Sequence, residues 1–246
     1  MKVIYEPKGK AREYSPLAVN LYKGCGHMCD YCYAPAALRM SREDFHVPVP
    51  RSNIIKNIEA DAKTLSEKNC RDPILLCFTC DPYQPIDSDY RLTRRVIEIL
   101  HSHNLKVRIL TKGGYRSKRD FDLLSWRPDL SEYGTTLVFN DEEQRRIHEP
   151  EASPTSDRIK ALKIAHSLGI PTWVSFEPVF DPKSVYQMID ETYEFVDRYS
   201  VGKLNHNKEV EDKVDWSLFH RKVTGLLDLY GKEYYIKNDL GRYNSR

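Results

Sequence analysis

The sequence lacks the features that place a protein in a membrane or in an oxidising compartment. Its longest apolar runs, such as residues 74–78, are far shorter than the roughly 20 residues that span a bilayer. Residues 1–6 lack the apolar stretch of a secretion signal. We therefore expect a cytoplasmic protein without a membrane partner, whose six cysteines are ligands or redox groups rather than disulfides.

The chain also lacks a marked excess of charge of either sign. Its 38 basic and 36 acidic residues leave a formal net charge of +2, which permits a nucleic-acid partner without requiring one. Internal repeats, low-complexity tracts and long linkers are absent. Because 246 residues with 40% hydrophobic content can bury a sizeable core, we expect a single domain over residues 1–246, with a C-terminal extension over about residues 205–246.

The most informative feature is a group of three thiols in a C-x3-C-x2-C spacing within residues 24–33. Soft thiolate ligands select iron–sulfur clusters or zinc over hard cations. Cys25, Cys29 and Cys32 can bind three irons of a [4Fe–4S] cluster and leave the fourth iron without a cysteine. Structural zinc sites and electron-transfer clusters normally have four protein ligands, so a vacancy indicates a site that binds and transforms another molecule.

Two other interpretations of these thiols exist, namely a zinc knuckle completed by His27 and three unrelated cysteines. His27 lies between the first two cysteines, where reaching a common metal requires an awkward turn. Gly24 and Gly26 let the backbone approach a cluster closely. The spacing therefore favours the [4Fe–4S] cluster.

Along the chain, apolar runs of strand length alternate with segments of helical period, which is typical of repeated βα units around a parallel sheet. The expected strands are Leu17–Tyr22, Ile74–Phe78, Val107–Leu110, Thr135–Phe139, Pro171–Phe176 and Tyr199–Leu204. The expected helices cover residues 54–65, 96–100, 121–126, 159–165, 185–193 and 219–230, and a closing segment covers Tyr234–Lys237. Six units are too few to close an eight-stranded barrel, so we expect a partial barrel with one open side that admits a large substrate.

The cysteine loop, with the aromatic Tyr31 just before its last cysteine, resembles the signature of the radical S-adenosylmethionine (SAM) superfamily. The resemblance implies that Cys25, Cys29 and Cys32 ligate a [4Fe–4S] cluster whose open iron takes the amino and carboxylate groups of SAM. It implies reductive cleavage of SAM to methionine and a 5′-deoxyadenosyl radical, with the electron from an external flavodoxin or ferredoxin-like protein. The implied fold is α/β, a partial (β/α)6 TIM-like barrel.

Other segments are similar to the spore photoproduct lyase-like, or DNA repair photolyase-like, branch of that superfamily, and the similarity covers most of the chain. They are residues 79–85, 92–94, 110–112, 119–120, 149–150, Arg158 and the turn at 169–171. The branch implies a nucleic-acid base or nucleotide as substrate. A peptide or a small metabolite remains the alternative, because kinship of fold does not fix a reaction.

The branch resemblance also assigns residues to the cofactor. Thr79, Cys80 and Asp81 follow the second strand and are expected near the methionine end of SAM. Lys112 falls where the branch has a lysine near SAM, and its charge can pair with the methionine carboxylate. Asn140, after the fourth strand, is expected to hydrogen-bond the ribose.

The hydrogen donor is where the chain departs from this branch. Spore photoproduct lyase quenches its product radical with a cysteine on the second strand, and alignment on Asp81 puts Phe78 at that position. Side chains alternate along a strand, so Phe78 and Cys80 should share a face while Cys77 points the other way. We therefore expect Cys80 to replace the donor, and a radical reaction other than thymine-dimer repair.

Two tyrosines and a glutamate complete the candidate site. Tyr31 and Tyr33 match tyrosines implicated in hydrogen-atom transfer in the branch, although an aromatic here also packs on the cluster loop in many relatives. Glu177 lies at the end of the fifth strand and so at the barrel mouth. It contacts either the substrate or the SAM amino group, or else it is a loop carboxylate paired with a lysine.

A second cysteine triple, Cys70, Cys77 and Cys80, has the spacing C-x6-C-x2-C, which could hold an auxiliary cluster. Strand alternation opposes this, and we interpret Cys77 as a small buried hydrophobe and Cys70 as a helix-end thiol. The sequence therefore predicts a radical SAM enzyme. The alternative of another class is a non-catalytic iron–sulfur or zinc protein that binds nucleic acid.

Overall fold

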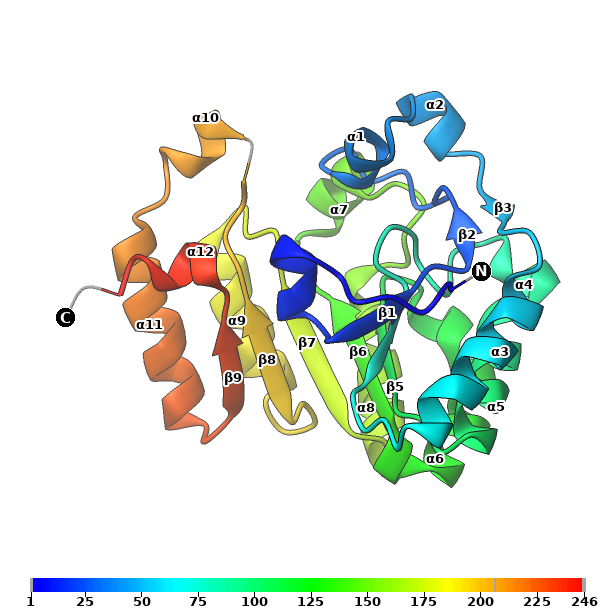
Figure 1. Cartoon of the computed structure of the whole chain (residues 1–246). Helices are drawn as coiled ribbons and strands as arrows, with labels where there is room; N and C mark the ends of the chain where they lie inside the picture. Colours follow the sequence, from blue (N-terminus) through cyan, green and yellow to red (C-terminus); the bar gives the residue numbers. More distant parts are fainter. Residues whose placement is uncertain (1, 206, 245–246) are drawn as a thin grey trace.

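The computed structural model describes residues 2–205 and 207–244, in which a seven-stranded parallel sheet forms the centre of an α/β fold (Figure 1). The strand order is β1-β4-β5-β6-β7-β8-β9, so neighbours in the sheet follow one another along the chain. The seven strands are β1 Leu17–Val19, β4 Ile74–Leu76, β5 Val107–Thr111, β6 Ser131–Thr136, β7 Thr172–Phe176, β8 Arg198–Val201 and β9 Glu233–Ile236. The predicted partial barrel is confirmed, with β1 and β9 as its two edges.

Helices between the strands cover the outer face of the sheet (Figure 1). The longer ones are α3 Ile54–Glu67, α5 Leu92–Ser102, α6 Phe121–Trp126, α7 Glu142–His148, α8 Thr155–Ser167, α9 Pro182–Thr192 and α11 Trp216–Leu229. The short ones are η1 Gly9–Glu13, α1 Ala34–Leu38, α2 Arg42–Phe45, α4 Asp87–Tyr90, η2 Gly114–Asp120, η3 Pro128–Leu130, α10 Lys208–Glu211 and α12 Asn238–Gly241. No helix in the described ranges has the length and apolar character needed to cross a bilayer.

The lower lumen of the barrel is filled by side chains from alternate positions of the strands. On β5, β6 and β8, Glu132 accepts from Arg108 at 2.7 Å and from Arg198 at 3.2 Å. Higher in the lumen, the Trp173 indole lies across Gly134, so closely that a Cβ there would be 2.3 Å from the indole nitrogen. A side chain on β6 would therefore displace the tryptophan, which explains the glycine.

The N-terminal segment crosses the open side of the barrel, where η1 lies in front of β7 in Figure 1. Tyr14, which follows η1, places its ring 6.4 Å from that of Trp173 and 5.8 Å from that of Phe78. Its carbonyl oxygen accepts a 2.6 Å hydrogen bond from Arg108. The segment thus packs into the lumen rather than extending into solvent.

The expected bounds of the first and fourth strands were wrong, each for a local reason. The first strand ends at Val19, because Asn20 turns its amide oxygen to the backbone N–H groups of Phe78 and Thr79. Tyr22–Lys23 instead forms β2, which pairs with β3 Val49–Pro50 in a separate sheet. The strand expected over 135–139 is β6 at 131–136, which was missed because its lumen face carries Glu132 and a glycine rather than apolar residues.

Further expectations at element ends need correction. The closing segment expected at 234–237 is β9, a seventh strand that pairs with β8. The helix expected over residues 159–165 is longer and begins at Thr155, whose hydroxyl donates to the carbonyl oxygen of Phe139 at 2.7 Å. The C-terminal extension expected over about residues 205–246 contains the helices α10, α11 and α12, while His206 lies outside the described residues.

Gly134→Ala tests the packing of the lumen. We expect a loss of about 1–3 kcal/mol in the free energy of unfolding, because the added methyl forces Trp173 out of its position. Urea unfolding followed by circular dichroism measures it. Gly225→Ala is the matched control, since Gly225 lies in α11 with open space around it and should gain up to about 1 kcal/mol. Equal stability of the two variants would contradict the packing described here.

Candidate functional site

The cysteine loop, residues 24–33, joins β2 to α1 at the carboxyl edge of the sheet. Gly24 has a φ of +92°, and a Cβ there would lie 2.5 Å from the carbonyl oxygen of Phe45. The next residue, Cys25, donates its N–H to that same oxygen at 2.8 Å. The N–H of Gly26 donates to the side chain of Gln84 at 2.8 Å. The loop is therefore held in place by backbone contacts that require glycine at its start.

The three thiols of the loop suit a cluster in their burial and charge. Burial raises the pKa of Cys29 to about 12, while the positive charges of Lys112 and Arg158 act in the opposite direction. Burial also raises the pKa of Cys25 and Cys32. Bare thiolates would be poorly tolerated here, whereas bound iron and the two nearby cations compensate their charge.

The zinc interpretation fits the geometry less well. His27 is buried, with Nδ1 3.4 Å from Asp81 and Nε2 2.9 Å from Arg116, so both ring nitrogens face protein partners. Burial lowers its pKa to about 4 and keeps the ring neutral. Within residues 2–205 and 207–244 no three metal-ligating side chains converge on a single ion. A cluster needs no such convergence, because each thiolate ligates a separate iron.

A buried carboxylate ties the loop to the barrel. Glu149 accepts a short hydrogen bond from the Tyr31 hydroxyl and another from Arg158 at 2.5 Å, and Lys112 Nζ lies 3.8 Å away. Glu149 and Arg158 have side chains with no solvent exposure. Burial opposes ionisation of Glu149, but the charges of Arg158 and Lys112 prevail and hold its pKa below the usual range.

Lys112, at the end of β5, is therefore turned toward the cysteine loop. Its Nζ lies 5.4 Å from the centre of the Tyr31 ring, close to Glu149 and to Cys29. Burial lowers its pKa, but the neighbouring Cys29 and Glu149 outweigh this and leave it raised, so the side chain stays a cation. The structure brings this predicted residue together with the predicted cluster ligands.

The segment after β4 presents the next predicted residues. Asn20 accepts from the backbone N–H of Thr79 at 2.7 Å, and the Thr79 hydroxyl is buried without a hydrogen-bond partner in the described structure. Asp81 accepts from the Thr111 hydroxyl at 2.6 Å and from the Lys112 backbone at 2.7 Å. Thr79 thus offers a free hydroxyl, while the Asp81 oxygens brace the end of β5.

The expected alternation over Phe78 and Cys80 was wrong, because β4 ends at Leu76 before it reaches them. The Cys77 and Cys80 thiols instead lie within hydrogen-bonding reach of each other, with Cys77 buried as expected. Tyr33 is half exposed, and its hydroxyl donates to the Phe78 carbonyl oxygen at 3.1 Å. Tyr33 therefore contacts the segment after β4 that carries Cys80.

Glu177 is paired with a lysine, as one of its two interpretations expected. Its carboxylate lies 2.6 Å from Lys237 Nζ and accepts a short hydrogen bond from the Tyr14 hydroxyl. The Lys237 ammonium also lies against the Tyr14 ring. Asn140 is placed differently from the others, since it is exposed and donates to Gln187 of α9 at 3.0 Å. The structure therefore ties Glu177, but not Asn140, to the upper lumen.

Sequence reasoning missed several residues of this site. His148 Nδ1 lies 2.7 Å from the Asp30 carboxylate of the cysteine loop, and its ring stacks on Phe139 with ring centres 5.0 Å apart. Tyr14 and Lys237 come from the two ends of the chain. Lys237 had only a weak signal in the sequence. It is the last residue of the expected closing segment, which the sequence pattern did not identify as a strand.

Comparison with known proteins agrees with this geometry. A sequence model of the Radical SAM superfamily matches residues 19–196. The chain belongs to the radical SAM superfamily. Membership implies a [4Fe–4S] cluster and SAM, and it confirms the predicted superfamily.

Relatives by sequence are similar over much of the chain. Uncharacterized protein MJ0683 of Methanocaldococcus jannaschii is 28% identical over 188 residues, which cover 76% of this chain and 70% of the relative. Uncharacterized protein ORF301 of Acidianus two-tailed virus is 27% identical over 186 residues, which cover 73% and 61%. Uncharacterized protein Rv2578c of Mycobacterium tuberculosis is 26% identical, and the match spans about half of its length, 48%.

Solved structures share the fold at low identity. Spore photoproduct lyase complexed with a dinucleoside spore photoproduct has a TM-score of 0.71 and 14% identity, covering 95% of this chain and 79% of that one. SuiB of Streptococcus suis bound to S-adenosylmethionine has a TM-score of 0.66 and 15% identity, covering 92% and 48%. These likenesses establish the fold.

Glu149→Gln tests the buried network. We expect the free energy of unfolding to fall by about 3–5 kcal/mol, because Arg158 would remain buried without its counter-charge. Urea unfolding measures it. Asp122→Asn is the control, since its carboxylate pairs with Arg94 at 2.7 Å on the surface and should cost less than about 1 kcal/mol. Similar losses in both variants would show that the buried Glu149–Arg158 pair contributes no more to the free energy of unfolding than a surface ion pair.

Proposed function

We propose that this chain is a radical SAM enzyme that holds a [4Fe–4S] cluster through Cys25, Cys29 and Cys32 and acts on a nucleic-acid base or nucleotide. The observation that carries the proposal is the three-thiol loop at the carboxyl edge of a partial barrel, tied to it by Glu149. The bound cluster and SAM supply the chemistry of the superfamily, reductive formation of a 5′-deoxyadenosyl radical that abstracts hydrogen from a substrate.

The chain's own residues would bind and orient the cofactor. The Lys112 cation beside the loop suits the methionine carboxylate of SAM, and the free Thr79 hydroxyl suits one of its polar groups. Asp81 would act indirectly, by fixing the end of β5 that carries Lys112. Asn140 is the weakest of the proposed contacts, because its amide is engaged with α9.

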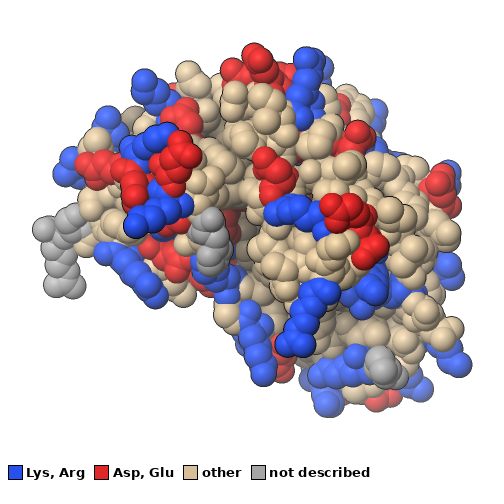
Figure 2. All heavy atoms as spheres, turned by 90° about the horizontal axis from the view of Figure 1, so that it is seen from above, with Lys and Arg blue, Asp and Glu red and all other residues tan. Residues whose placement is uncertain are grey.

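The upper lumen would receive the substrate. Glu177, Lys237 and Tyr14 form a polar cluster near Tyr33 and beside Phe78, which lies on the segment that carries Cys80. Seen from above, the molecule is hollowed between the part with α10 and α11 and the rest (Figure 2). Such an opening suits a substrate larger than the lumen, and the surrounding protein would exclude water from the reacting groups.

The substrate class is supported by the fold likeness to spore photoproduct lyase bound to a dinucleoside. A peptide is the second candidate, since SuiB bound to the precursor peptide SuiA also shares the fold, with a TM-score of 0.67. Both likenesses are under 25% identical, so the choice between them remains a proposal.

The central test is SAM cleavage by the purified protein. After anaerobic reconstitution with iron and sulfide and reduction with dithionite, we expect 5′-deoxyadenosine from SAM, measured by liquid chromatography. Cys29→Ala should give none, because the cluster loses a ligand. Cys70→Ala is the matched control and should retain activity, since Cys70 lies outside the loop and packs against the core.

Cluster formation without SAM binding would favour the non-catalytic alternative, an iron–sulfur protein that binds nucleic acid. Zinc as the sole bound metal would overturn the proposal.

Cys80→Ala tests the proposed hydrogen donor. We expect 5′-deoxyadenosine formation to continue while the product changes, because the substrate radical would lack its hydrogen source. Mass spectrometry of products formed from nucleotide substrates measures the change. Cys77→Ala controls for loss of the neighbouring thiol contact. An unchanged product from Cys80→Ala would remove Cys80 from the mechanism.

A further inference from the structure

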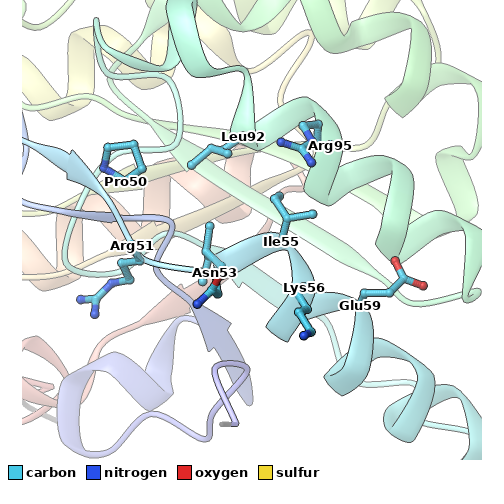
Figure 3. Close-up of a pocket in the computed structure, with 9 residues that line it drawn as sticks. Pro50, Arg51, Asn53, Ile55, Lys56, Glu59, Leu92 and Arg95 are labelled. Carbon is cyan, nitrogen blue, oxygen red and sulfur yellow. The ribbon is translucent and has the colours of Figure 1, made fainter.

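Two hollows flank β3 on the outside of the molecule. The first, about 520 Å³, lies between the first turns of α3 and α5, where Lys56 and Arg95 stand on either side of Ile55 (Figure 3). The second, about 420 Å³, lies on the other side of the strand. We call them together the β3 surface, whose cations are Lys23, Arg39, Arg51, Lys56 and Arg95.

The β3 surface is the outer side of the cysteine loop. Lys23 and Val49 are register partners in the β2–β3 pair, and the loop begins at the next residue. A Cβ at Gly26 would lie 3.8 Å from Pro48 and 3.6 Å from Pro85, so these two prolines flank the loop. Only a thin layer of protein therefore separates the cluster ligands from this surface.

A surface arginine reaches the ligand residues themselves. Arg42, which is exposed on α2 beside the second hollow, donates to the carbonyl oxygen of Cys29 at 3.3 Å and to that of Cys32 at 3.5 Å. A molecule that contacts Arg42 from outside thus comes within one side chain of two ligand residues.

The composition of the β3 surface suits an acidic protein. Its five cations face two carboxylates, Glu59 and Asp44, and Glu59 is engaged by His103 at 2.9 Å. Val47 and Val49 are 69% and 50% exposed at its centre. Apolar centres with charged rims are typical of protein interfaces, and electron-transfer contacts are among the smallest.

We propose that the β3 surface docks an acidic one-electron carrier protein of the ferredoxin or flavodoxin kind. The carrier gives one electron to the cluster and is oxidised by one electron, and no covalent bond forms or breaks. This inference rests on the proposed function, and it identifies the face of the protein from which the electron reaches the cluster. The substrate enters elsewhere, because the β3 surface lies outside α3 and α5 and does not open into the lumen.

The experiment compares two reductants of the reconstituted cluster. A reduced acidic [2Fe–2S] ferredoxin must dock on the protein before it can reduce the cluster, whereas the small molecule dithionite needs no docking surface. Bleaching of cluster absorbance in a stopped-flow instrument gives both rates for wild type and for Lys56→Glu/Arg95→Glu. We expect ferredoxin to reduce the double variant at least about tenfold more slowly at low salt, with a smaller difference at high salt. Dithionite should reduce both proteins equally.

Arg221→Glu/Lys222→Glu is the matched control, because it reverses two exposed cations on α11, away from β3. It should behave as wild type with both reductants. Equal ferredoxin rates for all three proteins at low salt would overturn the proposal. The proposal would also be overturned if the Lys56→Glu/Arg95→Glu variant lost oligonucleotide binding while ferredoxin still reduced it at the wild-type rate. That result would assign the β3 surface to nucleic acid.

Failure of the proposed function is distinguishable from failure of this inference. A wild type that ferredoxin reduces through the β3 surface but that does not cleave SAM would overturn only the proposed function. A wild type that incorporates no cluster would overturn both.

Discussion

The fully buried ion pair of Glu149 and Arg158 is the interaction on which the site depends. Two unpaired charges at this depth would be strongly unfavourable, so the pair holds the start of α8 and the end of α7 in one arrangement. Through its other oxygen, Glu149 fixes the Tyr31 hydroxyl and so the last turn of the cysteine loop. Lys112 completes the network from β5. A loop with little regular structure is thereby positioned by a carboxylate that lies more than a hundred residues later in the chain.

The two ends of the chain each contribute a side chain to the upper lumen. Tyr14 and Lys237 lie outside residues 19–196, the part that matches the superfamily, and both meet Glu177. A substrate in the upper lumen would contact groups that the shared part of the fold does not supply. Differences in substrate among proteins of this fold are expected to reside in such added segments.

The cysteine loop, most strands and the open barrel were predictable because each has a local signal: ligand spacing, apolar runs or helical period. The bounds of the strand at 131–136 could not be predicted, because its lumen side carries Glu132 and Gly134 instead of apolar residues. Glu132 is there to bind Arg108 and Gly134 to make room for Trp173, and both partners lie on other strands. The link between Tyr31 and Glu149 was not predictable either, because a tertiary hydrogen bond leaves no periodic pattern. The residues of the loop could therefore be named from spacing, whereas their supports required the fold.

The most direct measurement of the central claim is the electron paramagnetic resonance spectrum of the reduced, reconstituted protein with and without SAM. The account predicts about four irons per chain and a [4Fe–4S]⁺ signal whose g-values shift when SAM is added, because SAM binds the iron that lacks a cysteine. A cluster signal that SAM leaves unchanged would contradict an open iron in this loop and with it the assignment of Cys25, Cys29 and Cys32 as the complete set of protein ligands.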